Sequence, residues 1–512
     1  MSIKQKTIIY FNIIIFNVIL TQDPFPGYTL YSPSGMSNDN TSYLRDIDGS
    51  LVKSWNHSHG AASMPYLHSS GIEPGFESSL LYYPCRAPNP TMETGGVGGR
   101  VDILNWDGEL LYRYEIASTY YNHHHDIAVL PNGHFIVIAW ERLYSNDWQA
   151  LGRTSVNNNL NQMWATALFE IQPTLDGRTE SIENFDAVVW EWHITDHLVQ
   201  DVDASIDNYG SISDHPELFD VNCGTVGSNG GPGGQTNADW MHINAIDYNA
   251  DLDQIVFSSR HQGEIFIIDH STTTEEAASH SGGDSGMGGD FLYRWGGPGN
   301  YETGNNADNI LDSQHGINWI PDGYPGAGNL ILFNNHHSGS NAAALEFIPP
   351  LQEDGSYELD AGDPYGPDSW TWVYDSGLSS EMQSGAFRLP NGNTIITEAQ
   401  HARITEVTSA GQIVYEYEYP GNNVMIARAS KYAPEFFDSA YTLGDVNGDD
   451  AIDILDVVQT VNIVLGSMDS NPAADMNEDG ILNILDVITL VKYVLKVFIR
   501  ERNHSLHIYR LS

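Results

Sequence analysis

Cysteine and basic residues are scarce in this sequence. Only Cys85 and Cys223 occur among 512 residues, which argues against a cysteine nucleophile or a cysteine-based zinc site and leaves open whether the two form a disulfide. Lysine and arginine total 21 against 67 aspartate and glutamate residues, giving a net charge of −46. Because so negative a surface repels phosphates and anionic lipid, we expect no nucleic acid partner and no membrane partner.

Phosphate-binding motifs and long helical periods are also lacking over most of the chain. The glycine-rich stretches 223–239 and 280–290 contain no Lys-Ser/Thr pair and no following helix, so they are interpreted as surface lids or linkers rather than phosphate loops. With 48 glycines and 11% aromatic residues, the composition favours an all-β fold with many tight turns.

The N-terminus has the outline of a secretory signal. Lys4 and Lys6 precede an apolar run at 8–20, and polar residues and prolines follow. We expect residues 1–21 to be a signal peptide and the protein to be periplasmic or extracellular. An uncleaved anchor is the alternative, although the run is short for a membrane span.

Residues 22–432 contain a repeated hairpin pattern. LPNGHFIVIAWE at 130–141 and LPNGNTIITEAQ at 389–400 are near copies, with looser versions at 247–260 and 320–335. Each consists of an apolar strand, a turn and an alternating strand, and an aromatic-rich strand follows. About six such units lie between Tyr28 and Pro420, which predicts a six-bladed β-propeller. An irregular antiparallel sandwich is the competing architecture.

Histidine recurs at one position of this repeat. His125, His242 and His315 each lie five residues before the corresponding turn residue, whereas the sixth unit has Ser384 there. In a propeller this strand is the innermost, so the sequence predicts that the three imidazoles meet in one pocket. His124 is a weaker candidate, because strand alternation turns it away.

Arg260, in SSRHQGEI, adds a cation at the end of the second strand of its hairpin. Imidazoles beside a guanidinium suit an oxyanion such as sulfate or phosphate. Two other functions remain open: a metal-dependent lyase or hydrolase with His125, His242 and His315 as ligands, and a non-catalytic binding propeller. An arginine beside a metal, and the lack of a carboxylate in register, argue against the metalloenzyme.

The segments HHHDIAVLPNGH, DWMHINAIDYNADLDQIVFSSRHQGEIFIID, LYRWGGP, SQHGINW and NLILFNN resemble the bacterial arylsulfotransferase family. The resemblance implies a six-bladed propeller that transfers a sulfuryl group from a phenolic sulfate donor to a phenol acceptor, without an adenylylated sulfate donor and without a cofactor for the transfer. By motif, it makes His315 the transiently sulfated residue, His242 and Arg260 the sulfate-binding pair, and His125 the remaining site histidine.

After a linker at 433–441, residues 442–498 carry a duplicated acidic loop. DVNGDDAIDILD and DMNEDGILNILD lie 30 residues apart, each before an apolar helical run. Oxygen donors at loop positions 1, 3, 5, 9 and 12 follow the rule for calcium loops. The predicted structural Ca²⁺ ligands are Asp445, Asn447, Asp449, Asp453 and Asp456 in the first loop and Asp475, Asn477, Asp479, Asn483 and Asp486 in the second.

This duplicated unit resembles a type I dockerin. The resemblance implies a cohesin-type protein as a partner, contacted through Ile454, Leu455, Ile484 and Leu485. A calcium-stabilised terminal domain without a cohesin is the alternative. The basic tail at 499–512 is assigned no role.

Overall fold

The computed structural model describes residues 23–35, 39–69, 76–231, 234–438, 443–447, 451–467, 471–477 and 482–508. The predicted signal peptide and two of the predicted calcium ligands, Asp449 and Asp479, lie outside these ranges. In the described ranges, no helix is both long and apolar enough to cross a lipid bilayer.

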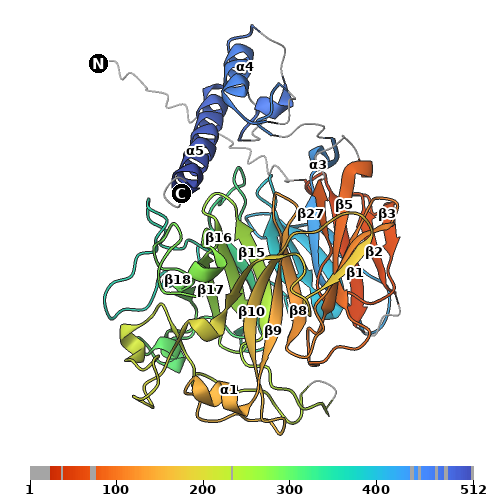
Figure 1. The fold of residues 1–512 in the computed structure, drawn as a ribbon. Coiled ribbons are helices and arrows are strands. Elements are labelled where there is room, and N and C mark those ends of the chain that lie inside the picture. The colour runs from red at the N-terminus through yellow and green to blue at the C-terminus, as the bar shows by residue number, and fades with distance from the viewer. Residues whose placement is uncertain are drawn as a thin grey trace, which may run out of the picture.

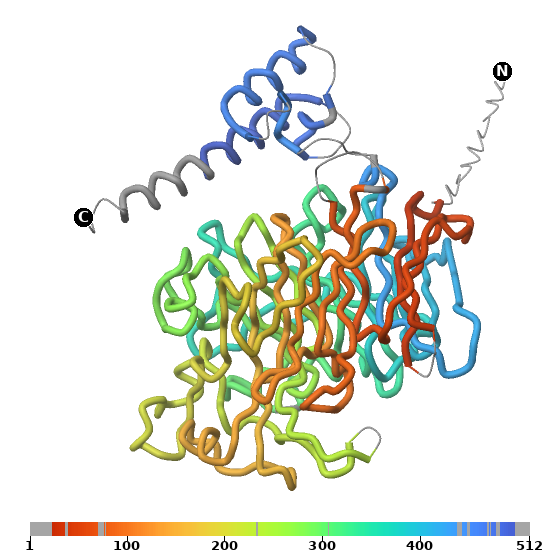
Figure 2. Tube along the Cα trace, turned by 45° about the vertical axis from the view of Figure 1, so that its right-hand side comes forward, coloured from red at the N-terminus to blue at the C-terminus, as the bar shows by residue number. Residues whose placement is uncertain are grey.

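Six sheets surround a central axis, which confirms the predicted six-bladed β-propeller (Figures 1 and 2). Their strands pair antiparallel, except that one added strand joins the outer edge of the second blade in parallel. From the channel outwards, the first blade contains β27 (Val424–Tyr432), β1 (Tyr28–Gly35), β2 (Thr41–Arg45) and β3 (Leu51–Asn56), and the second contains β4 (Tyr66–Ser69), β5 (Ser79–Arg86), β6 (Gly99–Leu104), β7 (Leu110–Glu115) and the added β11 (Arg178–Ser181). In the same order, the third contains β8 (Tyr121–Val129), β9 (Phe135–Leu143), β10 (Met163–Ile171) and β12 (Val188–His193).

Blades four to six follow along the chain. The fourth blade contains β15 (Ile243–Asn249), β16 (Gln254–Ser259), β17 (Glu264–Asp269) and β18 (Phe291–Trp295). The fifth contains β19 (His315–Trp319), β20 (Leu330–Ser338), β21 (Asn341–Phe347) and β22 (Trp372–Tyr374). The sixth contains β23 (Gly385–Arg388), β24 (Thr394–Glu398), β25 (Arg403–Val407) and β26 (Ile413–Glu418). Outside the blades lie α1 (Ser145–Ala150), α2 (Thr274–Ala277), α3 (Glu435–Asp438) and the short pair β13 (Leu198–Val199) and β14 (Phe219–Asp220).

The ring closes through its last strand. β27 pairs antiparallel with β1 and is the innermost strand of the first blade. This strand lies beyond Pro420, where the repeats were predicted to end, because its partners come from the other end of the chain and it carries no hairpin pattern of its own. The pairing joins the two ends of the propeller and leaves no open edge between the first and last blades.

The core lies between blades. Both faces of the middle strands are covered, so β10 and β17 are buried at every position and read as continuous apolar runs rather than alternating ones. Trp192, Trp240, Phe257 and Phe291 belong to the cluster that joins the third and fourth blades. The aromatic residues, 11% of the sequence, therefore pack largely between neighbouring blades.

Cys85 and Cys223 are both free thiols. Cys85 lies buried in β5, and Cys223 lies in the loop that follows β14. Burial raises the pKa of each thiol to about 12. The pairing that the sequence left open is therefore absent, and neither cysteine carries thiolate chemistry.

The C-terminal helices α4 (Ile454–Val464) and α5 (Ile484–Ile508) pack against each other through Val457, Ile463 and Leu490. Figure 1 shows them beyond the end of the propeller opposite to α1. The backbone of residues 499–508 in the predicted tail continues α5.

The two acidic loops fold around their last carboxylates, Asp456 and Asp486, which are fully buried. Asp456 accepts backbone N–H groups of Val446 and Asn447, at 2.8 and 3.0 Å, and Asp486 accepts the N–H of Asn477. Buried carboxylates at matching positions of both loops fit a divalent cation with oxygen ligands, as predicted for Ca²⁺.

Candidate active site

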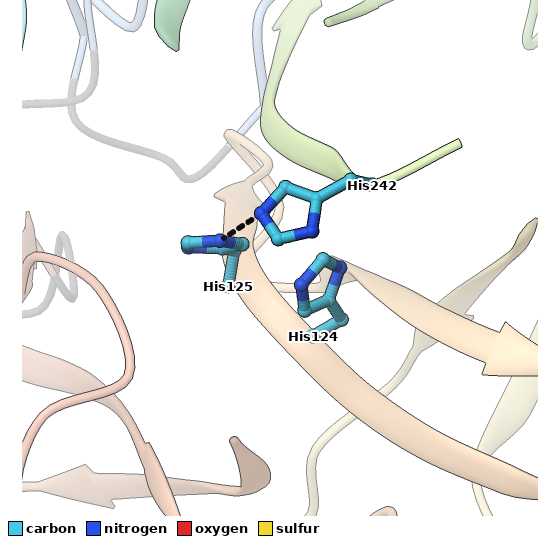
Figure 3. Close-up of side chains that lie close together, drawn as sticks. All are labelled: His124, His125 and His242. Carbon is cyan, nitrogen blue, oxygen red and sulfur yellow. Dashed lines mark hydrogen bonds between the residues drawn. The ribbon is translucent and has the colours of Figure 1, made fainter. Parts of the chain in front are cut away.

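The structure brings the three histidines in register together at the channel. His125 lies in β8, His242 directly precedes β15 and His315 begins β19, which are the innermost strands of three successive blades. Nε2 of His125 lies 3.2 Å from Nε2 of His242, and the His125 and His315 ring centroids are 6.1 Å apart (Figure 3 shows the first pair).

A break in the regular strand geometry aims these side chains. The β8–β9 register shifts between His123 and Ile127, and His125 has φ +59° and His242 φ +54°. Side chains with a Cβ adopt this left-handed region at a cost that the surrounding fold must offset, and such strain is concentrated at functional sites. The strands therefore present their histidines at the mouth of the channel instead of alternating across the sheet.

Strand alternation predicted that His124 points away from the site, and this prediction is wrong. The bulge in β8 ends the alternation, so His124 and His125 both reach the same region. The His124 ring stacks on Trp140 at 3.8 Å between centroids. It also lies 4.7 Å from the ring of His242, centroid to centroid (Figure 3 draws this pair).

A cavity of about 990 Å³ opens over this cluster. Part of its wall comes from the glycine-rich stretch 223–239, including Thr225, Gly227 and Ser228, so this stretch lines the site and is more than a linker. Gly96, with φ +77°, lies so close to the His125 ring that a Cβ there would stand 2.0 Å from Nε2. A glycine is therefore required beside His125.

His315 is held in one tautomer. Its Nδ1 lies 2.8 Å from Oδ1 of Asn335 and 2.9 Å from the carbonyl oxygen of Ser313, and two acceptors require Nδ1 to carry the proton. Asn335 is oriented in turn, because its Nδ2 donates to the carbonyls of Ser380 and Gln383. The other nitrogen, Nε2, keeps its lone pair on a residue that lines the cavity.

The neutral form of His315 is strongly favoured. Burial lowers its pKa to about 3; the bond to Asn335 opposes this shift, and the positive charge of Arg260 adds to it. His315 is therefore a neutral imidazole, with its one proton on Nδ1, throughout the physiological range. The neutral form is the one that acts as a nucleophile.

A buried carboxylate orients His242. Oδ2 of Asp239 lies 2.5 Å from Nδ1 of His242, and Oδ1 accepts the indole N–H of Trp140 at 2.9 Å. Burial alone would raise the pKa of Asp239, but the charge of His242 and its hydrogen bond outweigh burial and hold that pKa far below its usual range. Asp239 is therefore an anion, and its hydrogen bond holds a proton on Nδ1 of His242 and fixes the orientation of the ring.

Arg260 supplies the cation of the cavity. Its guanidinium is half-buried and has no hydrogen-bond partner among the residues that the structure describes. Burial lowers its pKa, and the nearby carboxylates of Asp312 and Asp239 oppose that shift. A charged guanidinium whose N–H groups are free to donate, beside three imidazoles, fits the binding of an oxyanion.

Sequence reasoning missed three residues of this site, Asp239, His261 and Asn335, and it gave His124 only as a weaker candidate. Asp239 opens the DWMH segment and Asn335 closes NLILFNN, so both belong to the segments that carry the family resemblance. Asp312 lies three residues before His315, as Asp239 does before His242, so the repeat carries a signal for Asp239 that a comparison of the histidines alone does not use.

The metal-ligand set proposed from the sequence differs from the group that the structure assembles. His124, His125 and His242 each offer a nitrogen within 4.8 Å of the others, whereas His315 belongs to no such group in the described part of the chain. Asp239 also supplies the carboxylate that the sequence interpretation lacked.

Comparisons with known proteins support two family assignments. The arylsulfotransferase (ASST) family model matches residues 176–347, a range that contains His242, Arg260 and His315 but not His125. The dockerin type I domain model matches residues 443–495. A search of curated proteins found no significant match.

Solved structures with some likeness include a protein of unknown function from Bacteroides caccae and the periplasmic gluconolactonase PpgL of Pseudomonas aeruginosa. Each is 10% identical to this chain; the TM-scores are 0.39 and 0.40, and the alignments cover 79% and 80% of this chain and 98% and 99% of the other. Scores this low carry no argument about function.

The two family matches agree with the resemblances predicted from sequence and support an arylsulfotransferase activity in general terms. Residues 176–347, within the six-bladed propeller, are thus similar to the arylsulfotransferase family, and residues 443–495 are similar to dockerin type I domains.

Proposed function

We propose that the propeller transfers a sulfuryl group from a phenolic sulfate ester to a phenol through a sulfohistidine intermediate on His315. The observation that carries this proposal is the fixed tautomer of His315: Nδ1–H is held by Asn335 and Ser313, so Nε2 is the nucleophilic nitrogen in a cavity that also holds Arg260.

In the first half-reaction, the lone pair of Nε2 on His315 attacks sulfur. An N–S bond forms, the S–O bond to the aryl group breaks, and the phenolate leaves with the bonding electrons. The sulfuryl group remains on Nε2, and Nδ1 keeps its proton and the hydrogen bond to Asn335. Arg260 stabilises the negative charge on the equatorial sulfuryl oxygens.

The pair of His125 and His242 moves the proton. A phenol has an unperturbed pKa near ~10, so proton donation to the departing oxygen lowers the barrier. The two Nε2 atoms lie within hydrogen-bond distance, at 3.2 Å, so a proton can pass from one to the other, and Asp239 orients the His242 ring. In the second half-reaction this pair takes the proton of the acceptor phenol, whose oxygen attacks sulfur and returns His315 to its neutral state.

We propose that the protein works outside the cytoplasm, with calcium in both acidic loops and a cohesin-type protein as its partner. The apolar side chains of Ile454, Leu455, Ile484 and Leu485 are 53–62% exposed and lie at corresponding places on α4 and α5. Exposed apolar residues in matching positions on two helices fit a docking surface.

A chromogenic aryl sulfate assay tests the transfer. Incubation with an added phenol is expected to release the chromophore and form a new sulfate ester in equal amounts, with and without EDTA. His315→Asn is expected to lose at least about 10³-fold in kcat, as removal of a nucleophile does, while the His215→Asn control keeps wild-type activity. Without an acceptor, release is expected to stop at about one chromophore per protein molecule, because His315 stays sulfated. Continued turnover without an acceptor, or activity that survives in His315→Asn, would rule the proposal out.

A further inference from the structure

The three-histidine cluster formed by His124, His125 and His242 has the form of a metal site (Figure 3). We propose that this cluster binds one divalent transition-metal ion of the Zn²⁺, Ni²⁺ or Cu²⁺ class, and that the bound ion reversibly inhibits the transfer reaction proposed above. The second part rests on the proposed function, whereas the binding itself does not.

His124 offers the most direct sign of a missing partner. Its Nε2 lies 3.1 Å from the carbonyl oxygen of Gly95 and therefore carries the proton. Its Nδ1 then holds a lone pair, and within the described ranges this buried atom has no hydrogen-bond partner. His124 itself is only 1% exposed. Buried nitrogen atoms without a partner are uncommon and call for a ligand.

His242 is oriented in the same manner. Asp239 occupies its Nδ1, which leaves Nε2 pointing at the cluster. Metal-bound histidines almost always donate their second ring N–H to a carboxylate or a backbone carbonyl. Asp239 and the Gly95 carbonyl fill these two roles, so two of the three ligands already have the outer partners of a metal site.

The spacing of the donor atoms fits a first-row ion. Nε2 of His125 and Nε2 of His242 are 3.2 Å apart, and two nitrogens on a tetrahedral ion with bonds of ~2.0–2.1 Å stand roughly 3.3 Å apart. All three nitrogens lie within 4.8 Å of one another. Three imidazoles without cysteine or exposed carboxylate ligands favour Zn²⁺, Cu²⁺ or Ni²⁺ over Ca²⁺ or Mg²⁺.

The cluster leaves a coordination position open. It borders the cavity of about 990 Å³, so water or a substrate oxygen can complete the coordination. Asp239 is a buried anion next to the cluster and offsets part of the repulsion between the ion and Arg260. An ion held here takes up the lone pairs of His125 and His242, and the proton can no longer pass between them.

Cobalt provides a direct readout, because Co²⁺ with nitrogen ligands in a tetrahedral site absorbs visible light far more strongly than Co²⁺ with oxygen ligands. The full chain, saturated with Ca²⁺ to fill the acidic loops, is expected to take up one Co²⁺ with such a band. His124→Phe is expected to lose the band. Asp239→Ala is expected to weaken Co²⁺ affinity by about 10–100-fold, the usual cost of removing an outer partner of a histidine ligand.

A second imidazole cluster provides the matched control. His197, His280 and Asp290 also place their donor atoms within 4.8 Å of one another, and His280→Gln removes the exposed member of that group. This variant is expected to keep the Co²⁺ band. A band that is absent from the wild-type protein, persists in His124→Phe or disappears in His280→Gln would overturn the site assignment. Should His124→Phe fail to fold, the Asp239→Ala titration decides.

Two further measurements separate the metal site from the transfer. His315→Asn is expected to bind Co²⁺ like the wild-type protein although transfer is abolished, because His315 is not a ligand. Wild-type transfer is expected to fall on addition of Zn²⁺ and to recover with EDTA. Transfer that is unaffected by Zn²⁺ at saturation of the site, or that requires Zn²⁺, would contradict the inhibitory role.

Discussion

At the residue scale, the site is a set of imidazoles whose protons are assigned by their neighbours. Asn335 and Ser313 fix the tautomer of His315, and Asp239 fixes that of His242. The repeat register was enough to predict that His125, His242 and His315 meet, because equivalent positions of innermost strands converge on the axis. It did not predict the orienting residues. Asn335 comes from the second strand of its hairpin, and the role of Asp239 follows from the contact of its carboxylate with His242 in the folded structure.

Asn335 is a positioning residue, and its replacement tests the tautomer argument. Asn335→Leu is expected to lower kcat by about 10²-fold with little change in KM, because the proton of His315 is no longer held on Nδ1 and the ring can rotate. Asn335→Asp keeps an acceptor for Nδ1–H but loses the donor to the Ser380 and Gln383 carbonyls, so it is expected to recover part of kcat. Steady-state kinetics of the wild type, Asn335→Leu and Asn335→Asp measure the changes in kcat and KM separately. Melting temperatures of the same proteins are the control for folding.

Equal losses of kcat in Asn335→Asp and Asn335→Leu would contradict the role of Asn335 as an acceptor. A purely structural role would lower the melting temperature of both variants without the split between kcat and KM.

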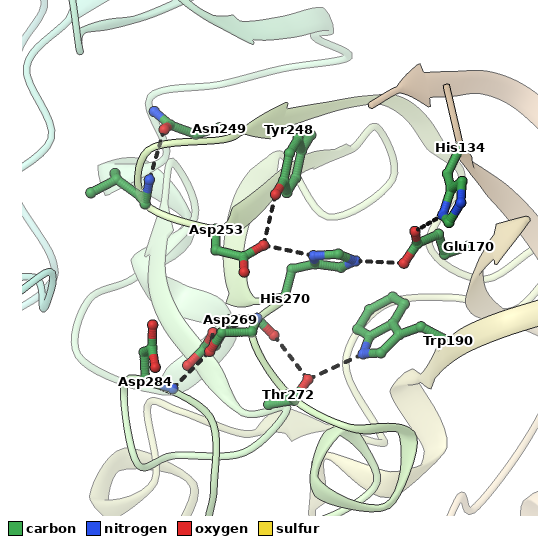
Figure 4. Close-up of polar contacts among 12 residues, drawn as sticks. His134, Glu170, Trp190, Tyr248, Asn249, Asp253, Asp269, His270, Thr272 and Asp284 are labelled. Atoms are coloured by element: carbon green, nitrogen blue, oxygen red, sulfur yellow. Dashed lines mark hydrogen bonds and ion pairs between the residues drawn. The ribbon is translucent and has the colours of Figure 1, made fainter. Parts of the chain in front are cut away.

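At the element scale, polar bridges join neighbouring blades, and several histidines serve this purpose rather than catalysis. His270 follows β17 and bridges Asp253 at 2.8 Å and Glu170 of β10 at 3.1 Å, while His134 contacts the other oxygen of Glu170 at 2.6 Å (Figure 4). Nothing in the sequence distinguishes these histidines from the catalytic candidates except their position outside the repeated register.

This bridge predicts a specific dependence of stability on pH. Burial alone would lower the pKa of His270, but hydrogen bonds to Asp253 and Glu170 outweigh it and raise the pKa to about 9, from 6.5. A raised pKa means that the bridge contributes its full stability below about pH 6.5 and loses it as pH rises through 9. Denaturant unfolding from pH 6 to 10 measures this dependence. At low pH the free energy of unfolding of the wild type is expected to exceed that of His270→Gln by up to about 3 kcal/mol, and the difference is expected to shrink above pH 9.

His215→Gln, at a half-buried residue outside this bridge, is the control for this series and is expected to follow the wild-type curve. A difference between wild type and His270→Gln that stays constant across the range would mean that the charge of His270 does not contribute.

At the scale of the whole molecule, the closing strand and the channel depend on each other. Arg428 of β27 forms an ion pair with Asp126 of β8 and donates to Ser63 at 2.7 Å, and Tyr66 of β4 donates to Asp126 at 2.6 Å. Three blades are thereby tied together across the axis. The hairpin repeats predicted the blades, but the closure depends on pairing between the chain's distant ends, which no local pattern encodes.

Removing the cation at this junction is expected to destabilise the ring. Arg428→Met leaves Asp126 buried without its partner, and the expected cost is about 3–5 kcal/mol in the free energy of unfolding. The double variant Arg428→Met/Asp126→Asn is expected to recover part of this loss, because no buried charge is left unpaired. Urea unfolding of the four proteins of this cycle measures the coupling; additive losses would contradict the ion pair as the cause.

Calcium removal is expected to affect only the C-terminal module. Within the described residues, the carboxylates of Asp456 and Asp486 accept backbone N–H groups of the module itself, whereas the module meets the propeller at Lys496, which donates to the Asp251 carbonyl at 2.7 Å. EGTA is therefore expected to abolish or lower the calorimetric transition of the module and to leave that of the propeller unchanged. A propeller transition that shifts with calcium would show that the two parts are coupled.

The central claim is that His315 carries the sulfuryl group between donor and acceptor. Its most direct test is mass spectrometry of the protein quenched after mixing with an aryl sulfate in the absence of any phenol acceptor. The account predicts the added mass of one SO₃ group on the peptide that contains His315, and its loss when a phenol is added. An unmodified His315 peptide under conditions where the phenol product is released, or the added mass on another residue, would contradict it.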